Sequence, residues 1–189
     1  MPFDHFNLIA GFYNRAGPFK VSEYLAGLLS LSPDCLLLDA GGGTGRVASV
    51  LRGLVGEVFV VDVSRGMLRH AADKGLASVC APAESLPFPP SSFNRVIMVD
   101  ALHHVNSQRQ TAEELWRVLA PGGRIVVVEP DIRNFFVRLI AICEKLLLMR
   151  SHFIIGEKIS SLFLNQDAKF SLYHEGVNII FIAEKVKRM

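Results

Sequence analysis

The chain reads LLLDAGGGTGR from Leu36 to Arg46, and this stretch decides the fold. An apolar run ends in an acid and leads into glycines and then a helical pattern, which predicts a buried strand, a tight turn and a helix start. Glycine permits positive φ and lets a ligand approach the backbone without a Cβ in the way. Because the first N–H groups of a helix lack partners within it, we expect this loop to hold a nucleotide-like small molecule.

The spacing of the glycines separates two kinds of nucleotide site. A dinucleotide-binding loop requires glycine, or alanine, at the sixth position of G-x-G-x-x-G. Counting from Gly41, the sixth position is Arg46, and the pattern present is Asp39-x-Gly41-x-Gly43-x-Gly45. A nicotinamide-dependent dehydrogenase, the competing enzyme, is therefore disfavoured.

Four further stretches follow the glycine loop in a definite order. They are VFVVD (58–62), AE (83–84), RVIMVDALHHV (95–105) and LAPGGRIVVVE (119–129). The first predicts a buried strand that ends in Asp62, whose carboxylate has enough lone pairs for two ribose hydroxyls. Together with the glycine loop, the four stretches resemble the class I S-adenosylmethionine-dependent methyltransferases, in their ubiquinone/menaquinone-methyltransferase-like (methyltransferase type 11) branch. The resemblance is strong over residues 35–130.

The expected fold is α/β, with three layers and a Rossmann-like methyltransferase topology. Strands alternate with helices, which predicts a parallel sheet with helices on both faces. Near the end, residues 168–174 and 177–183 are strand-like and only Glu175-Gly176 separates them, which predicts a hairpin. The resemblance implies a mostly parallel seven-stranded sheet ending in this antiparallel hairpin. We expect one domain over residues 1–189, with a helical lid at about 131–167.

The resemblance implies S-adenosyl-L-methionine as cofactor and assigns residues to it. The glycine loop would meet the methionine carboxylate through its N–H groups, Asp39 would help to hold the amino-acid end, and Asp62 would bind the ribose. The full set of expected cofactor residues is Tyr13, Asp39, Gly41, Gly43, Gly45, Asp62, Val63, Met67, Ala83, Glu84 and Asp100. Several have plainer alternatives: Asp62 could cap the next helix, Glu84 could cap the next segment, and Tyr13 could be a packed surface aromatic.

Three positions depart from the family pattern. Pro82 replaces the aspartate that usually precedes Ala-Glu and bonds the adenine amino group, and proline offers neither a side-chain acceptor nor an N–H. Asn94 and Asn14 also replace frequent aspartates. Pro82 is the main support for an alternative function, a catalytically inactive binding protein with a methyltransferase fold.

His103 and His104 are the candidate catalytic residues. They follow the fourth expected strand, where loops line the ligand crevice of such a sheet. Histidine can act as a general base near neutral pH, but the pair could equally line the pocket or serve structure alone. No third ligand has metal-binding spacing with them, so we expect no metal.

The acceptor is expected to be small and apolar or lipid-like. The fourth strand lacks the Asn/Asp-Pro-Pro-Tyr/Phe signature of many nucleobase amino-methyltransferases, and the net charge of +2 is too small to indicate nucleic acid. Residues 135–149 predict a helix that is apolar nearly all round and must bury most of that surface. It could form a hydrophobic lid, a dimer interface, or a shallow membrane contact aided by the recurring basic residues Arg138, Lys145 and His152; completing the core is the plain alternative.

Composition sets the remaining expectations. Half of the 189 residues are hydrophobic and a fifth are charged, which suits one folded domain. Cys35, Cys80 and Cys143 lie in apolar stretches without C-x-x-C spacing, so we interpret them as reduced core residues. Neither a signal peptide nor an apolar run long enough to span a bilayer is visible, so we expect a cytoplasmic protein. The sequence leaves the oligomeric state open.

Overall fold

The computed structural model describes residues 19–146, 152–163 and 168–187. The strands are β1 (Leu36–Ala40), β2 (Glu57–Asp62), β3 (Ala77–Cys80), β4 (Phe93–Val99), β5 (Leu119–Pro130), β6 (Ala168–Glu175) and β7 (Asn178–Lys185). The helices are α2 (Phe19–Leu29), α3 (Arg46–Leu51), α4 (Arg65–Asp73), α5 (Gln108–Val118), α6 (Phe135–Leu146) and α7 (Gly156–Leu162), and a 3-10 turn, η1 (Arg52–Leu54), follows α3.

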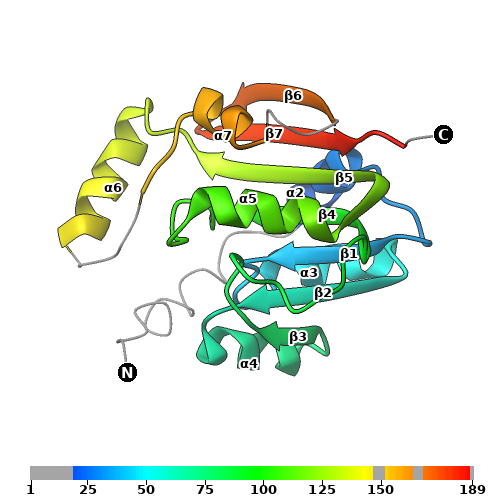
Figure 1. Cartoon of the computed structure of the whole chain (residues 1–189). Coiled ribbons are helices and arrows are strands. Elements are labelled where there is room, and N and C mark those ends of the chain that lie inside the picture. Colours follow the sequence, from blue (N-terminus) through cyan, green and yellow to red (C-terminus); the bar gives the residue numbers. More distant parts are fainter. Residues whose placement is uncertain (1–18, 147–151, 164–167, 188–189) are drawn as a thin grey trace.

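The strands form one mixed sheet in the order β3-β2-β1-β4-β5-β7-β6 (Figure 1). All pairs from β3 to β5 are parallel, whereas β7 is antiparallel to both β5 and β6. The mostly parallel seven-stranded sheet with a final antiparallel hairpin is thus confirmed.

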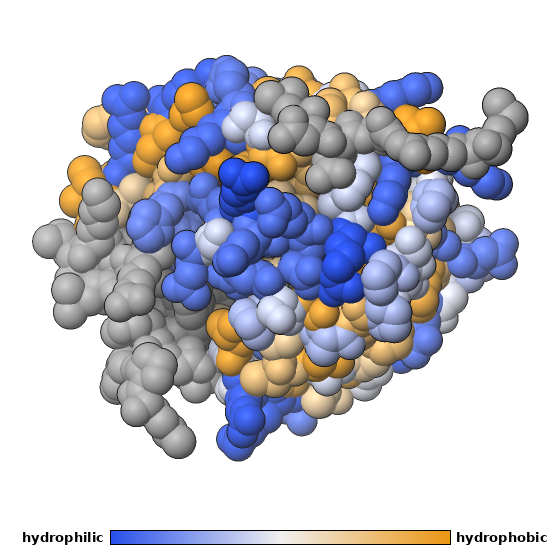
Figure 2. All heavy atoms as spheres, viewed as in Figure 1, coloured by the Kyte–Doolittle hydropathy of each residue, from blue (hydrophilic) through white to orange (hydrophobic). Residues whose placement is uncertain are grey.

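The sheet has an apolar layer on each face. Successive residues of a strand face opposite sides, and Leu37 accordingly packs with buried residues of α2, α3 and α4, while Leu38 packs with those of α5 and α7. The outer side of α5 is hydrophilic (Figure 2) and carries the exposed ion pair Arg109–Glu113. This arrangement confirms the three layers.

The strand order places the site. The chain runs from β1 outward to β2 and β3, and then returns to the other side of β1 through β4. Such a reversal opens a crevice at the carboxyl ends of the strands. The segments that begin at Gly41, Asp62 and Asp100 therefore meet at one edge of the sheet.

Helix α6 differs from the expectation. It stands apart from the layered body (Figure 1), and the exposed fractions of Phe135, Leu139 and Ile142 are 73%, 53% and 56%, whereas Val137 is buried. The expectation that this helix buries most of its apolar surface was therefore wrong for these side chains. Their spacing of four and three residues places them on one face of the helix, and that face does not contact the sheet. Hydrophobic atoms are exposed at this end of the molecule (Figure 2).

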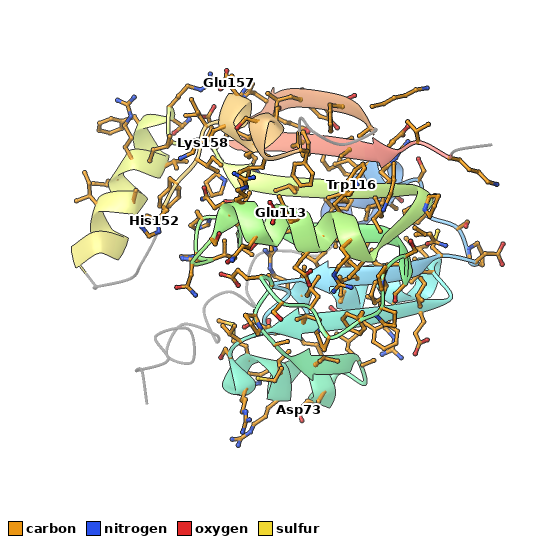
Figure 3. The ribbon with its side chains drawn as sticks, in the orientation of Figure 1. Asp73, Glu113, Trp116, His152, Glu157 and Lys158 are labelled. Carbon is orange, nitrogen blue, oxygen red and sulfur yellow. The ribbon has the colours of Figure 1, made fainter. Side chains whose placement is uncertain are left out.

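The expected basic stripe and the cysteine assignment also need correction. His152 is not on α6 but in the segment between α6 and α7 (Figure 3), so it does not continue a stripe from Arg138. Cys80 is exposed at the end of the edge strand β3 and is not a core residue, while Cys35 is buried as expected. The side chains of Cys143 and Lys145 lie outside the described part of the chain.

No helix in the described ranges combines the length and the apolar character needed to cross a bilayer.

Candidate functional site

The glycine loop between β1 and α3 is held in conformations that favour glycine. Gly41, Gly43 and Gly45 have φ of 71°, 54° and 70°. A Cβ on Gly45 would lie 2.4 Å from Leu76 Cδ1, so the loop also needs glycine to pack against the β3 side of the sheet.

The N–H groups of the loop bind protein oxygens. Those of Gly41 and Gly42 both donate to the Val61 carbonyl, at 2.7 and 3.1 Å, and that of Gly45 donates to the Gly42 carbonyl at 2.8 Å. The Gly43 N–H donates to Asp62 Oδ2 at 2.9 Å. The loop is thus tied to the end of β2, and in this structure these N–H groups are engaged within the protein instead of facing a ligand carboxylate.

Asp39 lies beneath the loop at the end of β1. Its carboxylate is buried and accepts the Ala48 N–H at 3.2 Å. Burial raises the pKa of Asp39 to about 7, Asp62 adds to the rise, and the Ala48 N–H and Arg46 oppose it. A Cβ on Gly42 would lie 2.6 Å from Asp39 Cγ, so the carboxylate occupies the space of a side chain there.

Asp62 connects the glycine loop to helix α4. Its Oδ2 accepts the Gly43 N–H, and its Oδ1 accepts the Ser64 N–H at 2.8 Å. Ser64 in turn is the N-cap of α4 and accepts the Met67 N–H at 3.3 Å. Because a carboxylate can accept several hydrogen bonds, positioning the loop is compatible with binding hydroxyl groups.

Arg46 and Asp100 form an ion pair that sequence reasoning missed. Arg46 Nη2 lies 3.7 Å from Asp100 Oδ2, and each side chain is about one-third exposed. Asp100 has a φ of 52°, an uncommon value for a residue other than glycine. In the sequence, the only indication that Arg46 belongs to the site was its position directly after Gly45.

Ala83 and Glu84 contribute the β3 side of the site. Ala83 is buried, and Glu84 Oε1 accepts the N–H groups of Asn106 and Ser107 at 2.6 and 3.3 Å. Glu84 thereby anchors the start of α5, whose N-cap is Ser107. Pro82 is exposed and its carbonyl accepts the Ser85 N–H at 3.0 Å.

The two histidines have different environments. His104 borders the cavity, and burial lowers its pKa to about 3, with the adjacent His103 acting in the same direction. His103 is buried, its Nδ1 lies 2.5 Å from Glu129 Oε2, and its ring stacks on Phe153 with centroids 4.5 Å apart.

One cavity brings most of the expected residues together. Those that line it are Asp39, Gly41, Gly43, Asp62, Val63, Met67, Ala83, Glu84, Asp100 and His104. Gly45 and His103 are not part of its lining, and Tyr13 lies outside the described residues. Lining residues that were not foreseen include Thr44, Arg46, Val99, Ala101, Val105 and Asn106. Within the described ranges, no three His, Cys, Asp or Glu side chains are grouped to hold a metal ion.

Comparison with known proteins identifies the family. The family model described as Methyltransferase domain (Methyltransf_11) matches residues 38–127. The ubiquinone/menaquinone biosynthesis C-methyltransferase UbiE of Stenotrophomonas maltophilia is 30% identical over 178 residues, which cover 88% of this chain and 68% of that protein. This chain belongs to the class I S-adenosylmethionine-dependent methyltransferases. It falls in their UbiE-like branch, and S-adenosyl-L-methionine is the cofactor that membership implies.

Another relative limits what can be carried over to this methyltransferase. UbiE of Bordetella parapertussis is 35% identical over 125 residues, which cover 60% of this chain and 48% of that protein. The chain thus spans about half the length of the first curated relatives that it matches. The acceptor of those relatives therefore does not transfer automatically.

Solved structures share the methyltransferase fold. An S-adenosylmethionine-dependent methyltransferase of Thermotoga maritima has a TM-score of 0.76 and 24% identity, over 95% of this chain and 98% of that chain. The [4+2]-cyclase SpnF has a TM-score of 0.76 and 16% identity, over 97% and 94%. Because a named cyclase has this architecture, the fold alone does not specify the reaction.

Proposed function

We propose that this protein transfers a methyl group from S-adenosylmethionine to a small, apolar, lipid-like acceptor. The observation that carries the proposal is the composition of one cavity at the carboxyl edge of the sheet. Its lining includes the glycine loop and the acid Asp62, and also the apolar side chains of Val99, Ala101 and Val105. A pocket that is mostly apolar with a few placed polar groups is typical of small-molecule sites.

The residues present fit the cofactor. A Cβ on Gly43 would approach Met67 Sδ to 3.0 Å, so glycine keeps the space beside Asp62 open. We assign Asp62 to the ribose, and Val63, Met67 and Ala83 to the adenine. When bound, S-adenosylmethionine supplies a methyl group activated by its positive sulfonium.

Charged side chains fit the methionyl end. Asp39 and Asp100 suit its amino group, and Arg46 suits its carboxylate because arginine binds carboxylates with directed, charge-assisted hydrogen bonds. All three line the same cavity. Arg46 would then donate hydrogen bonds to the carboxylate, because the N–H groups of the glycine loop already bind protein oxygens.

We assign His104 to lining the pocket and not to proton transfer. With a pKa of about 3 it is uncharged at neutral pH, and a base of that strength accepts protons poorly there. A neutral imidazole also avoids repulsion of a cationic donor. The main task of the chain is then to position donor and acceptor and to exclude water.

The acceptor assignment rests on the cavity and on the relatives. Their names describe ubiquinone and menaquinone biosynthesis, and the apolar lining here suits an acceptor of that chemical kind, such as a quinone precursor. We further propose that residues 1–189 form one methyltransferase domain in which the segment at about 131–167 covers the acceptor. The contact of Phe153 with His103 supports this cover, because it brings that segment beside the pocket-lining His104.

Two measurements test the proposal. S-adenosylhomocysteine should raise the melting temperature and NAD should not, because a ligand stabilises only the state that it binds. Incubation of a lipid extract with the protein and methyl-labelled S-adenosylmethionine should then yield a labelled apolar product. Stabilisation by NAD alone would contradict the cofactor assignment. Binding without transfer to any acceptor would favour the inactive binding protein that Pro82 suggests.

A further inference from the structure

Glu129 is a buried carboxylate that the proposed function does not use. It lies at the end of β5 with no exposed surface, where an unpaired charge would be costly. Its Oε1 accepts the N–H groups of Ala101 and Leu102 at 2.9 and 2.8 Å, and its Oε2 lies 2.5 Å from His103 Nδ1. A proton on Nδ1 that is donated to Oε2 satisfies both groups of this pair.

These contacts fix the turn that leaves β4. The Asp100 N–H donates to the Val128 carbonyl at 2.9 Å, and the His104 N–H donates to the Ala101 carbonyl at 3.1 Å. The positive φ of Asp100 is a strained value that persists only where the surroundings determine it. The turn presents Asp100, Ala101 and His104 to the cavity, so its shape is part of the cavity wall.

His103 also contacts the chain that enters α7. Its carbonyl accepts the His152 N–H at 2.6 Å, and its ring stacks on Phe153 at an interplanar angle of 18°. Gln108 reinforces the contact, because its Nε2 donates to the carbonyls of Leu102 and His152 at 3.3 and 2.8 Å. The side chain that Glu129 holds is thus the one on which the 152–155 segment rests.

We infer that Glu129 is a positioning residue for the acceptor end of the site: it fixes the 100–104 turn from behind and, through His103, docks residues 152–155 against that turn. The inference rests on the proposed function only in treating the cavity as the methyl-transfer site. Its consequence is that the buried Glu129–His103 pair couples the cavity wall to the segment proposed to cover the acceptor. The ribose end, held by Asp62 on β2, depends on this pair much less.

The test uses the full chain without cofactor and compares amide hydrogen exchange in Glu129→Gln and the parent. Exchange at Ala101, Leu102 and His152 should accelerate roughly tenfold or more, because hydrogen bonds to a charged acceptor are lost and local opening becomes easier. Amides in β2 should keep their protection. Glu184→Gln, which breaks the ion pair with Arg124 on the same sheet, is the matched control and should leave those three amides unchanged.

A spectroscopic readout separates positioning from general support. In Glu129→Gln the group beside His103 Nδ1 changes from a carboxylate to an amide, so the NMR signal of the Nδ1 proton should move upfield and broaden as that proton exchanges faster with water. Unchanged exchange at the three amides, or an equal loss of protection throughout the sheet, would overturn the inference. An unchanged Nδ1 proton signal would do the same.

His103→Asn is the second variant, and it tests the inference if Glu129→Gln does not fold. Asparagine can still donate to Glu129 but offers no ring to Phe153. Exchange at His152 should therefore accelerate while Ala101 and Leu102 stay protected, and unchanged exchange at His152 would refute the inference. None of these readouts involves S-adenosylmethionine or turnover, so failure of the proposed function would be recognised separately.

Discussion

Arg46 and Asp100 bring opposite charges to the cavity beside the glycine loop. Their side-chain atoms are 3.7 Å apart and partly exposed, and such pairs contribute little to stability. A ligand with both a carboxylate and an amino group can exchange this weak pair for two of its own. We propose that the pair serves ligand binding more than folding.

Replacing Arg46 with methionine should weaken S-adenosylhomocysteine binding about tenfold or more, since a charge-assisted hydrogen bond is lost. Affinity for 5′-methylthioadenosine, which lacks the amino-acid end, should stay nearly unchanged. Calorimetry with both ligands measures the difference. Equal losses for both would show that Arg46 supports the loop and does not bind the carboxylate.

Asp62→Asn should lower affinity for S-adenosylhomocysteine by about ten- to a hundredfold, because a charged acceptor for the ribose hydroxyls becomes neutral. Asp73→Asn is the control, since Asp73 is exposed at the end of α4 (Figure 3) and does not line the cavity. The Asp62→Asn variant should remain folded by circular dichroism. Unchanged affinity would mean that another group holds the ribose.

The turn into α3 depends on glycine for both conformation and space. Gly45→Ala combines a φ of +70° with a Cβ only 2.4 Å from Leu76 Cδ1, so it should lower the free energy of unfolding by about 1–3 kcal/mol. Gly53→Ala is the matched control, because no heavy atom lies within 4 Å of its added Cβ. Urea titration of both variants provides the measurement. Equal stability of the two would contradict the strain argument.

Helix α6 exposes an apolar stripe formed by Phe135, Leu139 and Ile142. Leu139→Gln and Ile142→Gln should change stability by only about 0.5 kcal/mol, as is usual for exposed positions. If α6 is part of the cover, they should reduce turnover of an apolar acceptor while cofactor affinity is retained. Val186→Gln, an exposed site beyond β7, is the control.

Other outcomes of the α6 variants would identify a different role. A change only in sedimentation would indicate a dimer interface, and a change only in liposome binding would indicate a membrane contact. Either result would contradict the cover.

At the scale of the whole molecule, Asp39 links folding and binding to pH. Its pKa of about 7 is above the ordinary 3.8. At a pH between these two values, the carboxyl group is protonated in the folded chain and ionised in the unfolded chain. Its contribution to stability therefore falls as pH rises through this window. An amino group bound near Asp39 favours the ionised carboxylate, so binding below about pH 7 must release that proton.

Affinity for S-adenosylhomocysteine should accordingly fall as pH is lowered from 8 to 6, approaching tenfold per pH unit at the low end. Calorimetry in buffers of different ionisation enthalpy should detect proton release at pH 6. Asp39→Asn should remove the pH dependence. An identical profile in that variant would place the titrating group elsewhere.

The sequence by itself determined the architecture, and it indicated which strand ends meet at the cavity. Apolar runs that end in Asp39 and Asp62, separated by turn and helix patterns, specify parallel strands whose ends meet, and the Glu175-Gly176 turn specifies the final hairpin. These features are local, because strand and turn preferences depend on neighbouring residues. They could therefore be read without knowing any contact.

Only the tertiary structure decided the roles of the charged and aromatic groups. His103 and His104 are adjacent in sequence, yet one lines the cavity and the other is buried against Glu129 on a neighbouring strand. Likewise, the periodicity of α6 could not show that its stripe is left exposed. The burial of a side chain and its hydrogen-bond partners depend on elements far apart in the chain. A local sequence pattern does not indicate which of those elements will pack beside it.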